Sequence, residues 1–273
     1  MPETTTVPTS DRSPEGDQPL ILFDKVVKRF GDNIVLRELD FRVGPGEHVT
    51  LIGPSGSGKT TILRLLMTLE RPDGGHIWVD GEPLWHMPKG DSLVPANEKH
   101  LRRVRTKIGM VFQQFNLFPN MTALQNVTEA PIRVLGKSRD EAERQGRELL
   151  ERVGLEAKVD EHPNQLSGGQ QQRVAIARAL SMEPKVLLLD EVTSALDPEL
   201  VAGVLAVLRE IAETTDLTML IVTHEMGFAR DVSDQVMMFD SGRIIEQGPP
   251  EKIFGACEED RTKRFLHAVL EAR

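Results

Sequence analysis

The 273-residue chain lacks several features that mark particular protein classes. Its single cysteine, Cys257, excludes an internal disulfide and fits a reducing compartment. No stretch approaches the roughly 18–20 consecutive apolar residues that a membrane-spanning helix needs. The first residues also lack the charged and then apolar pattern of a signal peptide. These absences predict a cytosolic chain that has no membrane span of its own.

An excess of basic residues is also absent. The chain has 33 Lys and Arg against 42 Asp and Glu, a formal net charge of −9. General nucleic-acid binding requires a basic footprint, so we expect no nucleic-acid partner. The apolar share of 39% and the charged share of 27% are ordinary for a soluble globular protein. The composition therefore favours one large domain with a substantial core.

The order of patterns along the chain predicts an α/β fold. Four prolines among Thr, Ser and acids predict a disordered tail over residues 1–19, and one domain over residues 20–273. Strand patterns over 20–23, 34–36 and 39–43 come first, and a strand at 48–52 then leads into a glycine loop and a helix at 60–68. A further strand pattern covers 76–81. A mainly helical insert follows over about 115–182. The apolar runs 186–189 and 219–222 are typical of buried parallel strands.

The glycine loop has the pattern G-x-x-x-x-G-K-[ST], which predicts a phosphate-binding loop. Its glycines allow backbone N–H groups to converge on a phosphate, and the following helix adds a favourable dipole. Lys59 is expected on β- and γ-phosphate oxygens, Thr60 on Mg²⁺ and Thr61 on the α-phosphate. The cofactors are therefore ATP and Mg²⁺. The loop consists of Gly53, Pro54, Ser55, Gly56, Ser57, Gly58, Lys59 and Thr60.

Two acids, Asp190 and Glu191, follow the apolar run 186–189. Open α/β sheets bind ligands at the carboxyl ends of their strands, which is where these side chains are expected. Asp190 is the candidate Mg²⁺ ligand, and Glu191 is the candidate general base for the attacking water. The alternative is a helix N-cap followed by a solvated charge, and the phosphate-binding loop makes this alternative weaker.

The segment Leu166–Gln170 (LSGGQ) is rich in small and polar residues, which do not build a core. It resembles the signature of the ATP-binding cassette (ABC) ATPases, and further motifs in the expected order support that resemblance over about residues 20–250. The resemblance implies an α/β P-loop NTPase fold with a parallel-sheet core, an N-terminal antiparallel β subdomain and an inserted helical subdomain. The signature residues are Leu166, Ser167, Gly168, Gly169 and Gln170. The further matches are Phe30 in KRFG, Gln113 after Val111-Phe112, Asp197 in SALD, and His224 in VTHE.

The resemblance implies a role for each of these residues. Gln113 would sense Mg²⁺ and the transmembrane partner, although Gln114 beside it leaves the register open. His224 would contact the γ-phosphate, a reading that its place after an apolar strand supports. Phe30 would stack on adenine, and its alternative is a place in the core. Ser167 and Gly169 would contact ATP held by a second copy of the chain, giving a homodimer that encloses two ATP molecules.

The resemblance also implies partners in a membrane. A transporter ATPase without its own span needs separate permease subunits, which would place it peripherally at the cytoplasmic face of the membrane. The apolar stretch 115–119 is the expected permease contact, and packing beneath the helical insert is its alternative. An extracytoplasmic solute-binding protein would complete the system.

The stretches FQQFNLF, TSALDPE and THEMGFAR resemble ATPases of bacterial importers for polar amino acids. The stretches LMTLE, WHMP and LVPANEKHL, together with Val192, are most similar to the ectoine and hydroxyectoine branch. The expected function is therefore ATP hydrolysis coupled to import of a polar amino acid or compatible solute. The expected solute is ectoine or hydroxyectoine. The alternatives are another ABC import or export system, or a non-transport ABC ATPase.

Overall fold

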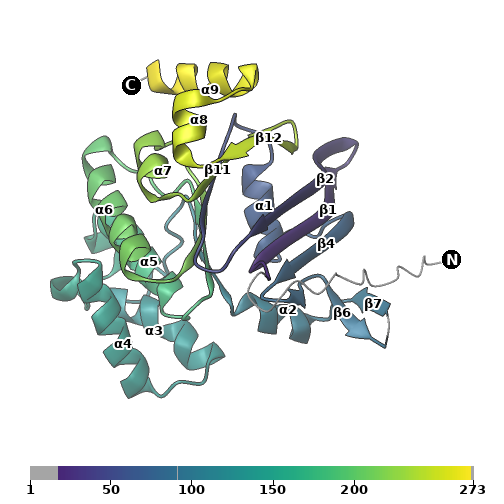
Figure 1. Ribbon diagram of the computed structural model, residues 1–273. Helices are drawn as coiled ribbons and strands as arrows, with labels where there is room; N and C mark the ends of the chain where they lie inside the picture. Colours follow the sequence, from purple (N-terminus) through teal and green to yellow (C-terminus); the bar gives the residue numbers. More distant parts are fainter. Residues whose placement is uncertain (1–17, 91, 272–273) are drawn as a thin grey trace. The chain divides into compact units, whose positions relative to one another are not determined.

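The computed structural model describes residues 18–90 and 92–271, which form two compact units (Figure 1). The first unit combines the chain up to Thr106 with the chain from Asp234 onward, and the second unit is Lys107–Ser233. The predicted tail 1–19 lies outside the described residues, apart from its last two. The predicted helical insert over 115–182 falls within the second unit, and its proposed boundaries stay a prediction.

An antiparallel sheet opens the first unit. Its strands lie in the order β2-β1-β4-β5. Alternate residues of β1, beginning with Ile21 and Phe23, are buried, as expected for a sheet with one face on a core. The predicted strand segments at 34–36 and 39–43 belong to one strand, β2. The bounds are β1 (Ile21–Phe30), β2 (Asn33–Val43), β4 (Gly74–Val79) and β5 (Glu82–Pro83).

A second set of strands in the first unit carries the glycine loop. Strand β3 (His48–Ile52) pairs parallel with β11 (Gln235–Asp240), which pairs antiparallel with β12 (Arg243–Gly248). The loop leaves the end of β3 and enters helix α1 (Lys59–Leu66). The remaining elements are β6 (His86–Lys89), β7 (Ser92–Pro95), α2 (Glu98–Arg105), α8 (Pro250–Ala256) and α9 (Asp260–Glu271).

Three parallel strands form the sheet of the second unit. Strand β9 (Val186–Asp190) lies between β8 (Ile108–Val111) and β10 (Thr218–Val222). All residues of these strands are buried, which explains why their sequences are continuous apolar runs and do not alternate. Because the strands are parallel, their carboxyl ends meet at one edge. The segments that follow them are therefore neighbours.

Helices cover this sheet, and polar caps start several of them. Thr122 at the start of α3 (Ala123–Val134) and Ser167 at the start of α5 (Gly168–Leu180) each form a capping box with a glutamine three residues later. Ser138 caps α4 (Arg139–Arg152). Helix α3 packs on α4 and α5, and α5 packs on α6. The bounds are α3 (Ala123–Val134), α4 (Arg139–Arg152), α5 (Gly168–Leu180), α6 (Pro198–Thr214) and α7 (Met226–Val232), with 3₁₀ turns at Glu156–Lys158 and Pro163–Gln165.

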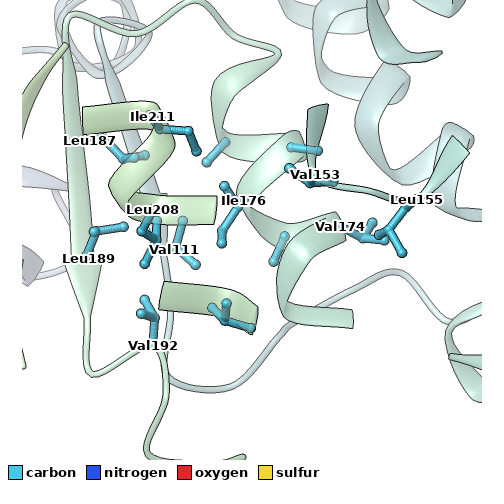
Figure 2. Close-up of a cluster of buried hydrophobic side chains, with 14 of the residues drawn as sticks. Val111, Val153, Leu155, Val174, Ile176, Leu187, Leu189, Val192, Leu208 and Ile211 are labelled. Carbon is cyan, nitrogen blue, oxygen red and sulfur yellow. The ribbon is translucent and has the colours of Figure 1, made fainter. Parts of the chain in front are cut away.

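The core of the second unit joins its sheet to α5 and α6 (Figure 2). Leu187 and Leu189 of β9, Ile176 of α5, and Leu208 and Ile211 of α6 are all fully buried. Burying one such side chain contributes about 1.5–3 kcal/mol, so this cluster is a large part of the unit's stability. The packed core holds the strand ends in place. The predicted parallel-sheet core, antiparallel N-terminal sheet and helical region are all confirmed.

Candidate functional site

The glycine loop of the first unit takes a backbone path that only glycine follows easily. Gly53, Gly56 and Gly58 have φ values of +141°, +77° and +114°. A Cβ on Gly53 would lie 2.0 Å from the carbonyl oxygen of Phe239 in β11, far below contact distance. A Cβ on Gly56 would meet no atom within 4 Å, so that part of the loop faces open space. The loop is therefore packed closely on one side and open on the other.

Lys59 closes the loop on itself. Its Nζ donates hydrogen bonds to the carbonyl oxygens of Gly53 (2.8 Å) and Pro54 (2.9 Å), and the side chain is buried. Phosphate oxygens accept from an ammonium more strongly than carbonyls do, so a phosphate can take over these bonds. The buried Ser57 hydroxyl finds no hydrogen-bond partner among the described residues, which is unusual for a buried polar group. Thr60 follows Lys59 in the first turn of α1.

Phe30, the predicted adenine platform, ends β1 and is 46% exposed. The alternative place in the core is therefore wrong. Lys28 holds the ring, because its Nζ lies 4.7 Å from the ring centroid. The same ammonium bonds the carbonyl oxygen of Arg71 at 2.8 Å and lies 3.3 Å from Glu70 Oε2. No sequence motif marks Lys28, although its place two residues before Phe30, on the same strand face, is a signal for a residue that could contact the ring.

The predicted acids stand at the carboxyl end of β9 in the second unit. Asp190 is the last residue of the strand and is buried. Glu191 follows with φ +46°, a left-handed conformation that non-glycine residues adopt at a cost and that clusters at functional sites. Its N–H donates to the carbonyl oxygen of Val222 at 2.9 Å. The N-cap alternative does not hold, because the next helix, α6, begins at Pro198.

His224 reaches the predicted base. It lies two residues beyond β10, whose last residue, Val222, pairs with Asp190. His224 Nε2 is 3.2 Å from Glu191 Oε1, within hydrogen-bonding distance. Residues 33 positions apart in sequence are thus brought together at one sheet edge. A paired carboxylate and imidazole at this place can orient a water molecule or a phosphate oxygen.

Gln113 lies at the same edge, two residues beyond the end of β8, which pairs with β9. Its side chain is exposed, and so is that of Gln114, so burial does not distinguish the two glutamines. Both positions leave an amide free to reach a ligand.

The predicted signature forms the start of α5. The Ser167 hydroxyl accepts a hydrogen bond from the Gln170 N–H, and Gln170 Oε1 accepts one from the Ser167 N–H. Gly169 packs against α6, where an added Cβ would lie 3.2 Å from Leu200 Cβ. Gly168 is the other glycine of this turn. Leu166 is the exception to the expectation that this segment avoids the core, because it is buried in the hydrophobic cluster of the second unit.

Asp197, the remaining predicted site residue, occupies the N-cap position of α6 without using its side chain as a cap. The predicted site residues therefore fall into two sets. The phosphate-binding loop, Thr61 and Phe30 belong to the first unit, and the others belong to the second unit.

The ABC transporter family profile matches residues 36–194, more than half of the chain. The chain belongs to the ABC transporter family. The predicted fold class, the P-loop fold of the ABC ATPases, is thereby confirmed. The activity of the chain is ATP hydrolysis coupled to transport.

Individual members of the family match nearly the whole chain. A probable amino-acid ABC transporter ATP-binding protein of Sinorhizobium fredii is 61% identical, covering 92% of this chain and 98% of that protein. An arginine transport ATP-binding protein of Corynebacterium glutamicum is 49% identical, covering 93% and 99%. The ATP-binding cassette MJ0796, solved as a dimer bound to ADP and Pi, is 34% identical with a TM-score of 0.72, covering 84% and 98%. Across residues 18–90 and 92–271, no helix is long and apolar enough to cross a membrane.

Proposed function

We propose that the chain is the ATP-hydrolysing subunit of an importer for a polar amino acid. The observation that carries this proposal is the 61% identity, over 92% of the chain, to a probable amino-acid ABC transporter ATP-binding protein. The arginine transport relative supports the same solute class. The proposed place of work is the cytoplasmic face of a membrane, against permease subunits supplied with solute by an extracytoplasmic binding protein.

The narrower expectation of ectoine or hydroxyectoine rests on a few short stretches outside the ATP site. The relatives support amino-acid import better than this narrower reading, so an amino acid is the preferred solute. The ATPase would not choose between them, because the binding protein and the permeases contact the solute. The solute therefore needs a transport measurement of its own.

Within the ATPase, the loop Gly53–Thr61 is proposed to bind the phosphates, and Phe30 to stack on adenine. The donors proposed for Mg²⁺ are the Thr60 hydroxyl, the Asp190 carboxylate and the Gln113 amide oxygen. All are hard oxygen donors, and Mg²⁺ commonly binds through one or two side chains together with phosphates. The metal, when bound, neutralises charge that develops on the β- and γ-phosphates.

Glu191 is the proposed general base. As a water oxygen forms its bond to the γ-phosphorus, the carboxylate accepts the proton of that water, and the bond from phosphorus to the β–γ bridging oxygen breaks. His224 is proposed to hold the carboxylate and to contact a γ-phosphate oxygen, and its 3.2 Å approach to Glu191 supports the first of these roles. The left-handed backbone at Glu191, anchored on Val222, supports a fixed direction for the carboxylate.

The second half of each site is proposed to come from a second copy of the chain. Ser167, Gly168, Gly169 and Gln170 would contact the γ-phosphate held by the partner copy, and Asp197 would lie at the contact between copies. The exposed Ser167 at the start of α5 supports this, because a helix N-terminus favours an anion. The dimeric MJ0796 structure supports the pairing. Loss of the γ-phosphate would then open the pair and move the permeases.

The replacement of Glu191 by glutamine tests the mechanism. The amide has the shape of the carboxylate and cannot accept the proton, so turnover should fall by roughly 10²–10⁴-fold. ATP binding should persist, and size-exclusion chromatography with ATP should detect a stable dimer. Glu199→Gln, an exposed acid in the first turn of α6, is the matched control and should keep normal turnover. Normal turnover in Glu191→Gln would remove Glu191 as the base.

Uptake measurements test the solute. Cells that carry the transporter, and cells from which this ATPase is deleted, should be compared for uptake of labelled arginine, glutamine, histidine, cystine and ectoine. Loss of amino-acid uptake on deletion supports the proposal. Loss of ectoine uptake alone would establish the narrower reading, and loss of export would overturn import.

A further inference from the structure

Three main-chain carbonyls around Gln113 accept hydrogen bonds from one helix. Gln172 Nε2, in α5, donates to the Phe112 carbonyl oxygen at 3.2 Å. Arg178, in the same helix, donates from Nη1 to Asn116 O at 2.7 Å and from Nη2 to Phe115 O at 3.1 Å. These contacts bracket Gln113 on both sides. We call residues 112–116 the Gln113 loop.

The loop also touches the start of α5. A Cβ on Gly168 would lie 3.5 Å from the Phe115 ring, so the ring packs against the first turn of the helix. That turn carries the Ser167 cap. The helix rises about 1.5 Å per residue, so the six steps from Gln172 to Arg178 span about 9 Å of the helix. The Gln113 loop and the signature motif are thus attached to the same helix.

Gln172 has a feature that stability alone does not explain. Its side chain is fully buried, and its Oε1 accepts no hydrogen bond from the described part of the chain. A buried polar atom left without a partner destabilises a fold. A methionine of similar size would fill the same space without this cost. An amide at this position therefore points to a function for the bond that its Nε2 donates.

Arg178 presents a similar case. Its bonds go to carbonyl oxygens of the loop, and its guanidinium also lies 5.8 Å from the Phe118 ring. Burial lowers the pKa of Arg178, which reflects the cost of desolvating its charge. The loop adopts a left-handed φ of +49° at Asn116, the residue whose carbonyl Arg178 holds. A partly buried cation thus stabilises an unfavourable backbone conformation three residues from Gln113.

We propose that Gln172 and Arg178 are positioning residues that fix the Gln113 loop on α5, so that Gln113 and the Ser167 turn move as one body. This rests on the proposed function, in which Gln113 is an Mg²⁺ ligand and Ser167 contacts ATP. Neither positioning residue is among those proposed to bind nucleotide; both act through the carbonyl oxygens of the Gln113 loop.

The first test measures the loop directly, without nucleotide. The chain's single cysteine allows a nitroxide label on Gln114→Cys in a Cys257→Ser background. In the parent the label should show an immobilised component in its electron paramagnetic resonance spectrum. Gln172→Met should lose that component, whereas the matched control Gln145→Met should keep it, because Gln145 bonds the far end of α5 at Ser181 O. An unchanged spectrum in Gln172→Met overturns the proposal.

The second test measures the consequence for Mg²⁺. Gln172→Met should raise the Mg²⁺ concentration for half-maximal ATPase activity roughly tenfold. Losing a residue that orients a metal ligand weakens metal binding by about 10–100-fold, and the expected shift is at the lower end of that range. The same shift should be found in Mn²⁺ binding with a non-hydrolysable ATP analogue. Gln172→Met removes the unpaired Oε1, which stabilises, and removes the donor to the Phe112 carbonyl oxygen, which destabilises, so the midpoint of thermal unfolding should stay near that of the parent. A purely structural role would instead lower the midpoint and leave the metal dependence unchanged.

A double-mutant cycle separates this inference from the proposed function. If Gln172 acts through Gln113, adding Gln172→Met to Gln113→Ala should cause no further shift in Mg²⁺ dependence. Additive shifts overturn the inference and leave the proposed site intact. No shift in Gln113→Ala itself removes Gln113 as a ligand and overturns both. Arg178→Lys, which keeps the charge but loses the two-carbonyl geometry, provides the same test if Gln172→Met does not fold.

Discussion

Gly53→Ala should be far more damaging than Gly56→Ala, although both glycines belong to the phosphate-binding loop. Both residues have positive φ, which costs an alanine about 1–3 kcal/mol. The difference lies in the surroundings. A Cβ on Gly53 would lie 2.0 Å from Phe239 O and 3.0 Å from its carbonyl carbon, while a Cβ on Gly56 would meet nothing within 4 Å.

The magnitude follows from these contacts. Relieving the overlap at Gly53 requires the loop and the β11 backbone to separate by about 1 Å, since backbone atoms cannot rotate away as a side chain does. Overpacking of this kind costs about 1–3 kcal/mol, and strain on the neighbouring Ile52–Met238 pair adds up to about 1 kcal/mol. Together with the φ term, Gly53→Ala should lose about 2–7 kcal/mol of unfolding free energy, against about 1–3 kcal/mol for Gly56→Ala, which has the φ term alone.

Urea denaturation of the isolated ATPase, followed by fluorescence of its two tryptophans, measures both values. ATP titration of each folded variant shows whether the loop still binds phosphate. Equal losses of stability in the two variants would refute the reasoning, because they would mean that the close approach to Phe239 contributes nothing beyond the φ requirement.

Two further predictions concern the first unit. Phe30→Ala should weaken ATP binding roughly tenfold in calorimetry, because base stacking on an aromatic ring contributes about 1–3 kcal/mol. Phe30→Trp should retain the affinity of the parent. Equal ATP affinities in Phe30→Ala and the parent would exclude Phe30 as the residue that stacks on adenine. Burial would raise the pKa of Glu246, but hydrogen bonds from the N–H groups of Glu258 and Glu259 outweigh this and lower it below its ordinary 4.5. Its stabilising effect is therefore present above pH 4.5 and lost as the pH falls through the lowered pKa, so Glu246→Gln should cost about 1–2 kcal/mol at pH 7 and progressively less in acid. A cost independent of pH by urea titration would contradict this.

Local chemistry explains what could be predicted from the sequence. The phosphate-binding loop, the buried runs at 186–189 and 219–222, and the strand that ends in Asp190 all depend on residues near each other in the chain. The order of strand, glycine loop and helix was confirmed for the same reason. The strands of the antiparallel sheet were predicted with looser bounds, because a register shift between Leu36 and Leu39, where Glu38 has φ +47°, interrupts the alternation of β2.

Contacts between distant residues were not visible in the sequence. The hydrogen bond from Gln172 to Phe112 joins residues 60 positions apart, and no sequence motif at either residue predicts this contact. Lys28 beneath Phe30 and the burial of Leu166 likewise depend on how strands and helices pack. A side chain's neighbours across a fold are set by tertiary packing, which short-range patterns do not encode.

The sequence by itself determined the family, the phosphate-binding chemistry and the candidate acids, because each resides in a short run of residue types at required spacing. Only the tertiary structure decided how those residues are held. It placed His224 on Glu191, gave Glu191 its left-handed backbone and tied the Gln113 loop to α5. Parallel strands bring their carboxyl ends to one edge whatever their separation in sequence, and that edge is where the scattered motifs of the second unit become neighbours.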